Sequence, residues 1–74
     1  MRYRIRLETY SDVMRFVGKA ENFGKPLLLT DGNRYCVNAK SLLGCLATVE
    51  WNNIFIESES ESPQVYSVFE EFIF

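Results

Sequence analysis

The residues that most constrain the fold lie at the start of the chain, where polar and apolar side chains alternate without a break. Arg2 to Leu7 reads Arg, Tyr, Arg, Ile, Arg, Leu. Successive side chains of a strand point to opposite faces, so three arginines share one face, and Tyr3, Ile5 and Leu7 share the other. The pattern predicts a strand with one buried face, which needs a second layer of structure to cover it.

The remaining patterns predict a two-layer α+β protein. At 74 residues the chain has room for one domain, residues 1–74. After the first strand, a helix is predicted at about 11–23, starting at Ser11-Asp12 and stopping at Gly24. A hairpin of strands 27–30 and 35–37 follows, with its turn at Asp31-Gly32-Asn33. The remaining elements are a short helix capped by Ser41, a strand at 54–60 and a last helix that begins at Ser62-Pro63. This order, β-α-β-β-(short α)-β-α, predicts an open-faced sandwich with the helices on one face of an antiparallel sheet.

Several apolar positions carry their own predictions. The first helix presents an apolar stripe of Val13, Phe16, Val17, Ala20 and Phe23, and the last one a stripe of Val65, Tyr66, Phe69, Phe72 and Ile73. We expect Cys36 and Cys45 to be small buried side chains, because no metal-ligand or CxxC spacing is present. Phe72 or Phe74 is an alternative candidate for a dimer contact, since large apolar residues are unusual at a terminus.

The chain has no histidine, which excludes several chemistries. There is no imidazole for general base catalysis, for activating a nucleophile or for binding a metal, and two cysteines alone do not complete a zinc site. We therefore expect no enzyme activity, metal or cofactor. No apolar run approaches the ~20 residues of a membrane span, and the charged start of the chain does not fit a signal peptide. These features predict a cytoplasmic protein with no membrane partner.

The charges are distributed unevenly along the chain. Residues 1–49 hold all eight basic residues and four acids, and residues 50–74 hold six acids and no base. The basic half could form a nucleic-acid surface, or the two halves could pair. If Ile54 and Ile56 face the core, Phe55, Glu57 and Glu59 lie opposite the arginines of the first strand. Pairing is the simpler explanation, so we expect no nucleic-acid partner.

One segment resembles a known family. The residues from Val37 to Ala47 read Val-Asn-Ala-Lys-Ser-Leu-Leu-Gly-Cys-Leu-Ala. They resemble the segment that opens the short second helix in the HPr family, the histidine-containing phosphocarriers of the bacterial sugar phosphotransferase system. The order of elements is similar over nearly the whole chain. The resemblance implies the HPr-like sheet, in which the strands lie in the order 1-4-2-3.

The active-site loop of that family is not preserved. In these phosphocarriers the loop before the first helix carries Gly-x-His-Ala-Arg-Pro, and its histidine takes a phosphoryl group from enzyme I. Here the corresponding loop is shorter and contains Thr9, Tyr10, Ser11 and Asp12 in place of those residues. The resemblance therefore implies a degenerate member that cannot carry phosphohistidine. A free helix N-terminus can still hold an anion, although Asp12 would compete for it.

The second-helix segment implies a regulatory site and a docking patch. In Gram-positive members the serine matching Ser41 is phosphorylated by a dedicated kinase and gates binding to a transcriptional regulator. The family's partly exposed apolar residues here match Leu42, Leu43 and Leu46, next to Lys40, and dock enzyme I, the kinase and other partners. The alternatives are that Ser41 is only a helix cap and that the leucines only complete the core.

Three functions remain open on the sequence alone. The first is a non-catalytic, protein-binding regulator related to the phosphotransferase system, a monomer or weak homodimer whose partner resembles enzyme I, HPr kinase or a transcriptional regulator. The second is a phosphocarrier whose acceptor is Thr9, Tyr10 or Ser11 instead of histidine. The third is a structural homodimer unrelated to sugar transport.

Overall fold

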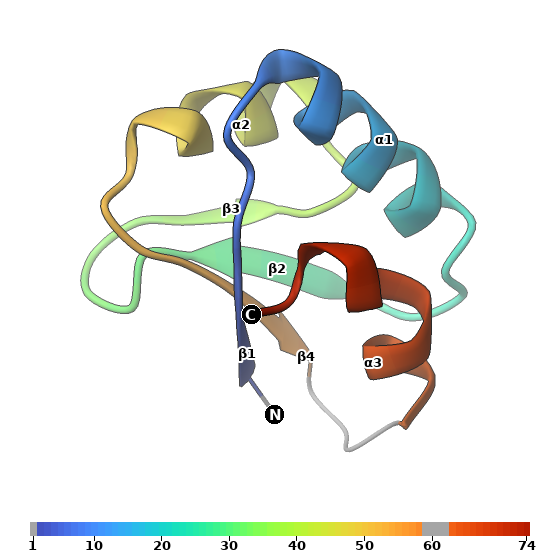
Figure 1. The fold of residues 1–74 in the computed structure, drawn as a ribbon. Coiled ribbons are helices and arrows are strands. Elements are labelled where there is room, and N and C mark those ends of the chain that lie inside the picture. Colours follow the sequence, from blue (N-terminus) through green and yellow to red (C-terminus); the bar gives the residue numbers. More distant parts are fainter. Residues whose placement is uncertain (1, 59–62) are drawn as a thin grey trace.

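A four-stranded antiparallel sheet in the order β1-β4-β2-β3 forms one layer of the computed structural model, which describes residues 2–58 and 63–74 (Figure 1). The strands are β1 (Arg2–Ile5), β2 (Leu27–Thr30), β3 (Cys36–Asn38) and β4 (Ile54–Ser58). The helices are α1 (Tyr10–Glu21), α2 (Leu42–Leu46) and α3 (Pro63–Phe69), with short 3-10 turns η1 (Ala47–Glu50) and η2 (Glu70–Phe72). The predicted α+β class and strand order are confirmed. The predicted end of the last strand at residue 60 and the Ser62 cap lie outside the described residues.

One core joins the inner face of the sheet to the helices. Alternation along β1 and β4 buries Ile5, Ile54 and Ile56, and these side chains belong to the same cluster as the buried stripe of α1. Phe16 at the centre of α1 lies 5.0 Å from Phe69, measured between ring centroids. The aromatic contacts therefore tie the C-terminal helix to α1 across the core.

The N-terminus of α1 differs from the prediction by two residues. Thr9, not Ser11, is the N-cap: its hydroxyl accepts a hydrogen bond from the Asp12 amide, and the Asp12 carboxylate accepts one from the Thr9 amide. This reciprocal pair is a capping box, which satisfies two amides that the helix would otherwise leave without an acceptor. Ser11 is an exposed position of the first turn.

The C-terminus of α1 also comes earlier than predicted. Asn22 caps the helix in a right-handed conformation, and its side-chain amide donates to the Gly18 carbonyl. Gly24 therefore does not end the helix by adopting a positive φ. Phe23 lies beyond the cap and is still buried as predicted, because its amide donates to the Ala20 carbonyl and keeps the chain against the core.

The hairpin turn between β2 and β3 forms as the sequence predicts. The Asp31 carboxylate accepts hydrogen bonds from the amides of Asn33, Arg34 and Tyr35, and Gly32 takes a φ of +82°. A residue with a side chain is strained in that conformation, and a Cβ there would also meet the Phe55 ring at 3.0 Å. The turn sequence therefore fixes where the two strands reverse direction.

The C-terminal residues cover the outer edge of β1. Ile73 forms a bridge with Ile5, the Arg6 amide donates to the Phe72 carbonyl, and the Phe74 amide donates to the Arg4 carbonyl. Phe72 is buried in the core and is not available for a dimer contact, whereas Phe74 is 57% exposed. The edge strand is thereby paired rather than left open.

Two other apolar predictions need correction. Cys36 is exposed, because it lies on the edge strand β3, while Cys45 is buried as expected. Burial raises the pKa of the Cys45 thiol to about 11, so this thiol stays protonated and unreactive at neutral pH. Tyr66 is exposed rather than part of the buried stripe, and its ring meets the ring of Tyr3 edge-on.

Candidate functional site

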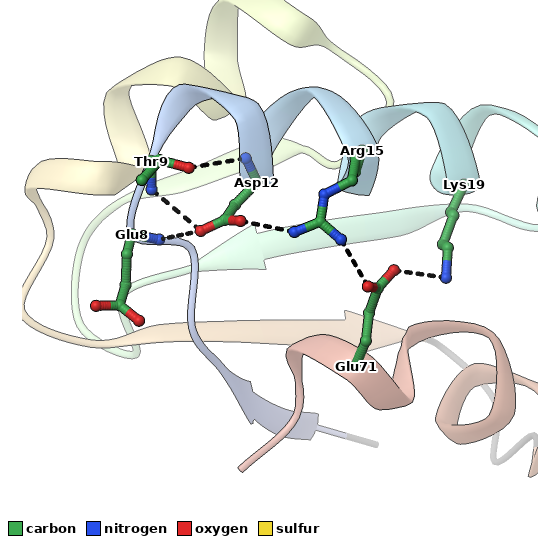
Figure 2. Close-up of polar contacts among 6 residues, drawn as sticks. All are labelled: Glu8, Thr9, Asp12, Arg15, Lys19 and Glu71. Atoms are coloured by element: carbon green, nitrogen blue, oxygen red, sulfur yellow. Dashed lines mark hydrogen bonds and ion pairs between the residues drawn. The ribbon is translucent and has the colours of Figure 1, made fainter.

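The residues of the degenerate loop lie at the N-terminus of α1, where Glu8, Thr9 and Asp12 form hydrogen bonds with one another (Figure 2). One oxygen of the Asp12 carboxylate accepts from the amides of Glu8 at 3.0 Å and Thr9 at 3.1 Å. The Thr9 hydroxyl lies 3.1 Å from the Asp12 amide. The Asp12 carboxylate thus lies at the positive end of the helix, where its charge would repel an external anion.

A chain of ion pairs leads from this loop to the C-terminal part of the molecule. The second oxygen of Asp12 lies 2.7 Å from an Arg15 nitrogen, and another Arg15 nitrogen lies 2.6 Å from Glu71 of η2. Glu71 also pairs with Lys19 at 2.7 Å (Figure 2). Because one arginine bridges two carboxylates, the loop, α1 and η2 are held in a single network.

These contacts shift the pKa values of the carboxyl groups. Hydrogen bonds from the Glu8 amide and from Arg15 lower the pKa of Asp12 below its usual value. The Lys19 ammonium and the Arg15 guanidinium lower the pKa of Glu71 in the same direction. Both groups therefore favour the folded state when they are ionised.

Acid should weaken the fold through this network. A carboxyl with a lowered native pKa stabilises above its unfolded pKa, near ~4, and that contribution is lost as the pH falls through the native pKa. We expect the free energy of unfolding to be nearly constant from pH 7 to about pH 5 and to decline below about pH 4. Urea denaturation across this range measures it. Asp12→Asn should be less stable at pH 7 and decline less steeply; a decline as steep as that of the wild type would contradict the assignment.

Ser41 is an exposed N-cap of α2, as predicted. Its hydroxyl accepts a hydrogen bond from the Gly44 amide at 3.3 Å. Lys40 is not a free neighbour of Ser41, because its ammonium donates to the Phe23 carbonyl at 2.7 Å and is only partly exposed. Lys40 therefore ties the start of α2 to the end of α1, and its assignment to the docking patch is not supported by its contacts.

The predicted docking leucines divide into two kinds. Leu43 is 84% exposed and Leu42 is 41% exposed, although both are large apolar residues. Leu46 is partly buried and packs against the core. Within the predicted patch, Leu42 and Leu43 are thus the most exposed side chains, and Leu46 and Lys40 are only partly exposed.

Two further exposed apolar side chains lie on α1. Tyr10 is 63% and Met14 is 61% exposed, and they are four residues apart on one side of the helix. The opposite flank of α1 carries Arg15 and Lys19, which contact η2. Tyr10 and Met14 therefore lie on the flank away from η2, and α1 packs beside α2 (Figure 1). We call Tyr10, Met14, Leu42 and Leu43 the α1–α2 surface.

The α1 part of this surface lies outside the docking patch predicted from the sequence. The sequence pattern places Tyr10 in the degenerate loop and among the candidate phosphate acceptors, and Met14 outside the apolar stripe of its helix. A signal was present, because both are large apolar residues outside the stripe of Val13, Phe16 and Val17. Apolar residues that a helix does not bury mark a surface available for interaction.

Within residues 2–58 and 63–74, no group of three or more His, Cys, Asp or Glu side chains is arranged to hold a metal. No helix in the same part of the chain is long and apolar enough to cross a membrane. Comparison with protein-family models, with curated proteins and with solved structures found no match to this chain.

Proposed function

We propose that this chain is an HPr-like, protein-binding module that cannot carry phosphohistidine and that regulates phosphotransferase-type signalling in the cytoplasm. Its elements follow the order of that family, and its strands have the family's order, β1-β4-β2-β3. The residues from Val37 to Ala47 run from β3 through α2, which is where the family carries its similar segment. Fold and segment together support the relationship.

The observation that carries the proposal is the Asp12 carboxylate at the N-terminus of α1. In the family, this helix end presents the histidine that receives the phosphoryl group. Here the Asp12 carboxylate accepts hydrogen bonds from the amides of Glu8 and Thr9 through one oxygen and from the Arg15 guanidinium through the other. A phosphoryl group brought to Thr9, Tyr10 or Ser11 would approach a fixed negative charge. This arrangement argues against the alternative in which a hydroxyl replaces histidine.

The α1–α2 surface is the proposed docking site. Its four large apolar side chains are exposed on two adjacent helices of a small protein. A partner that binds there would remove this apolar surface from water, which is favourable. Docking by such a surface does not depend on phosphotransfer, because it needs no histidine.

Ser41 is the proposed regulatory position. Its exposed hydroxyl lies at the first turn of α2, directly before Leu42 and Leu43. A phosphate there would add about −1.5 to −2 charges at the border of the apolar surface. Because the Lys40 ammonium donates to the Phe23 carbonyl, a direct ion pair with the phosphate would have to compete with that hydrogen bond. We propose that phosphorylation changes partner choice at this surface.

A titration monitored by NMR tests the proposal. Enzyme I, and separately HPr kinase, are added to the ¹⁵N-labelled chain, and the amide signals are followed. We expect the signals of Tyr10, Met14, Leu42 and Leu43 to shift or broaden first, while those of the β2–β3 turn stay in place. If neither protein changes any signal, or if the changes are confined to the sheet, the proposed docking function is wrong.

A further inference from the structure

A surface cavity of about 470 Å³ lies beside β1, at a site separate from the α1–α2 surface. Its lining includes residues 4–8, residues 51–54 and Phe74. The volume lies within the range of pockets that bind small molecules. The lining brings together the first strand, the connection from η1 to β4 and the C-terminal residue, which are distant in the sequence.

Two arginines on the same face of the chain line this cavity. The guanidinium carbons of Arg4 and Arg6 lie 5.0 and 4.2 Å from the centre of the Phe74 ring. Arg4 also donates to the side-chain carbonyl of Asn53 at 2.9 Å. The aromatic ring contacts both guanidinium groups and the Asn53 amide also contacts that of Arg4, so part of their freedom is restricted before a ligand binds.

In the described part of the chain, the guanidinium groups of Arg4 and Arg6 form no ion pair with a carboxylate, although Glu8 lines the same cavity. The arginines of the first strand are predicted to lie opposite Phe55, Glu57 and Glu59, and among the residues that the structure describes only Arg2 of these arginines pairs with an acid, at 2.7 Å from Glu57. Within the described residues, neither Arg4 nor Arg6 has a carboxylate at ion-pair distance. Arg4 lies opposite Phe55 instead of an acid. Two like charges beside one ring repel each other, and an anion placed between them would relieve that repulsion.

The chemistry of the lining defines the ligand. We propose that this cavity binds a small-molecule oxyanion, with a phosphate or carboxylate group between the guanidinium groups of Arg4 and Arg6. Guanidinium donors form paired hydrogen bonds with the oxygens of both groups. Since the Asn53 carbonyl is used by Arg4, its NH₂ group is left to donate to the same anion. Glu8 also lines the cavity, so the two guanidinium groups would hold the anion against the repulsion of one carboxylate.

Arginine side-chain NMR tests the site with two probes, inorganic phosphate and succinate, at pH 7 and constant ionic strength. We expect saturable shifts of the Nε–Hε signals of Arg4 and Arg6 and of the Asn53 side-chain amide, with at least one of the two anions. Sodium chloride at the same ionic strength should not produce them. Shifts that are equal in chloride, or absent with both probes, would overturn the proposal.

Substitutions distinguish specific binding at Arg4 and Arg6 from non-specific attraction of anions to a positive charge. Arg6→Gln should weaken binding by about tenfold or more, the loss expected for a charged hydrogen-bond partner. Arg34→Gln removes the same charge from the β2–β3 turn and should change binding less than twofold. Arg4→Gln provides a second variant if Arg6→Gln disturbs the amide spectrum. An equal loss of anion affinity in Arg6→Gln and Arg34→Gln would contradict the proposed site.

A titration with nucleic acid tests whether the arginines bind a different ligand. A single-stranded oligothymidine is titrated in the same buffer. We expect it to bind no more tightly per phosphate than the inorganic ion. Much tighter binding, with shifts extending to Arg2 and Phe55 on the outer face of the sheet, would indicate a nucleic-acid surface and contradict the small-molecule proposal.

Discussion

Phe69→Ala is expected to remove about 3–5 kcal/mol from the free energy of unfolding, which is the usual cost of emptying a buried phenylalanine site. Phe69 is fully buried, and its ring contacts the rings of Phe16 and Phe23 of the first helical region. These contacts join α3 to α1. A domain of this size has a total stability of roughly 4–11 kcal/mol, so the loss would leave much of the variant unfolded under mild conditions.

Urea denaturation followed by circular dichroism measures this effect. Tyr66→Ala is the matched control, because Tyr66 is an aromatic residue of the same helix whose side chain is exposed. We expect it to cost less than about 1.5 kcal/mol, since it loses mainly an edge contact with Tyr3. Equal losses for the two variants would show that α3 does not pack through the Phe69 side.

Leu43→Asp is expected to weaken binding of the partner at the α1–α2 surface by at least about 30-fold, the equivalent of ~2 kcal/mol for a central interface residue. Leu43 is 84% exposed, so its replacement should change the free energy of unfolding by no more than about 0.5 kcal/mol. Isothermal titration with enzyme I or HPr kinase measures the binding, and thermal denaturation checks the fold.

A matched pair of neutral substitutions controls for the added charge. Leu43→Gln and Leu28→Gln make the same change on different faces, since Leu28 is exposed on β2 of the sheet. We expect Leu43→Gln to reduce binding and Leu28→Gln to leave it unchanged. Unchanged affinity of Leu43→Asp for the partner, or equal losses of affinity in the two Gln variants, would show that the α1–α2 surface is not the docking site.

Much of the fold could be predicted because local pattern and tertiary structure agree. The alternation from Arg2 to Leu7 places Ile5 and Leu7 in the core, and Asp31 with Gly32 forms the predicted turn. The start of α1 was misplaced because two residues, Thr9 and Ser11, both have hydroxyls that cap helices. The deciding feature was in the sequence: Asp12 stands three residues after Thr9, which is the spacing of a capping box.

The contacts at the candidate site could not be derived in the same way. Whether Lys40 is free depends on the distance to the Phe23 carbonyl, a contact between residues 17 apart. Phe55 and Glu57 lie opposite arginines of the first strand as predicted, but only the register of β1 and β4 shows that Arg4 meets Phe55 and Arg2 meets Glu57. The short helix α2 leaves Leu43 exposed and Leu46 partly buried, and a five-residue helix has too little periodicity to predict this difference.

Phosphate transfer from labelled phosphoenolpyruvate, in the presence of enzyme I, tests the central claim most directly. Intact-mass measurement and peptide mapping follow the label, and the NMR titration is run on the same sample. The account predicts that the chain binds through Tyr10, Met14, Leu42 and Leu43 and acquires no phosphate. Phosphate on Thr9, Tyr10 or Ser11 near one equivalent per chain would contradict it.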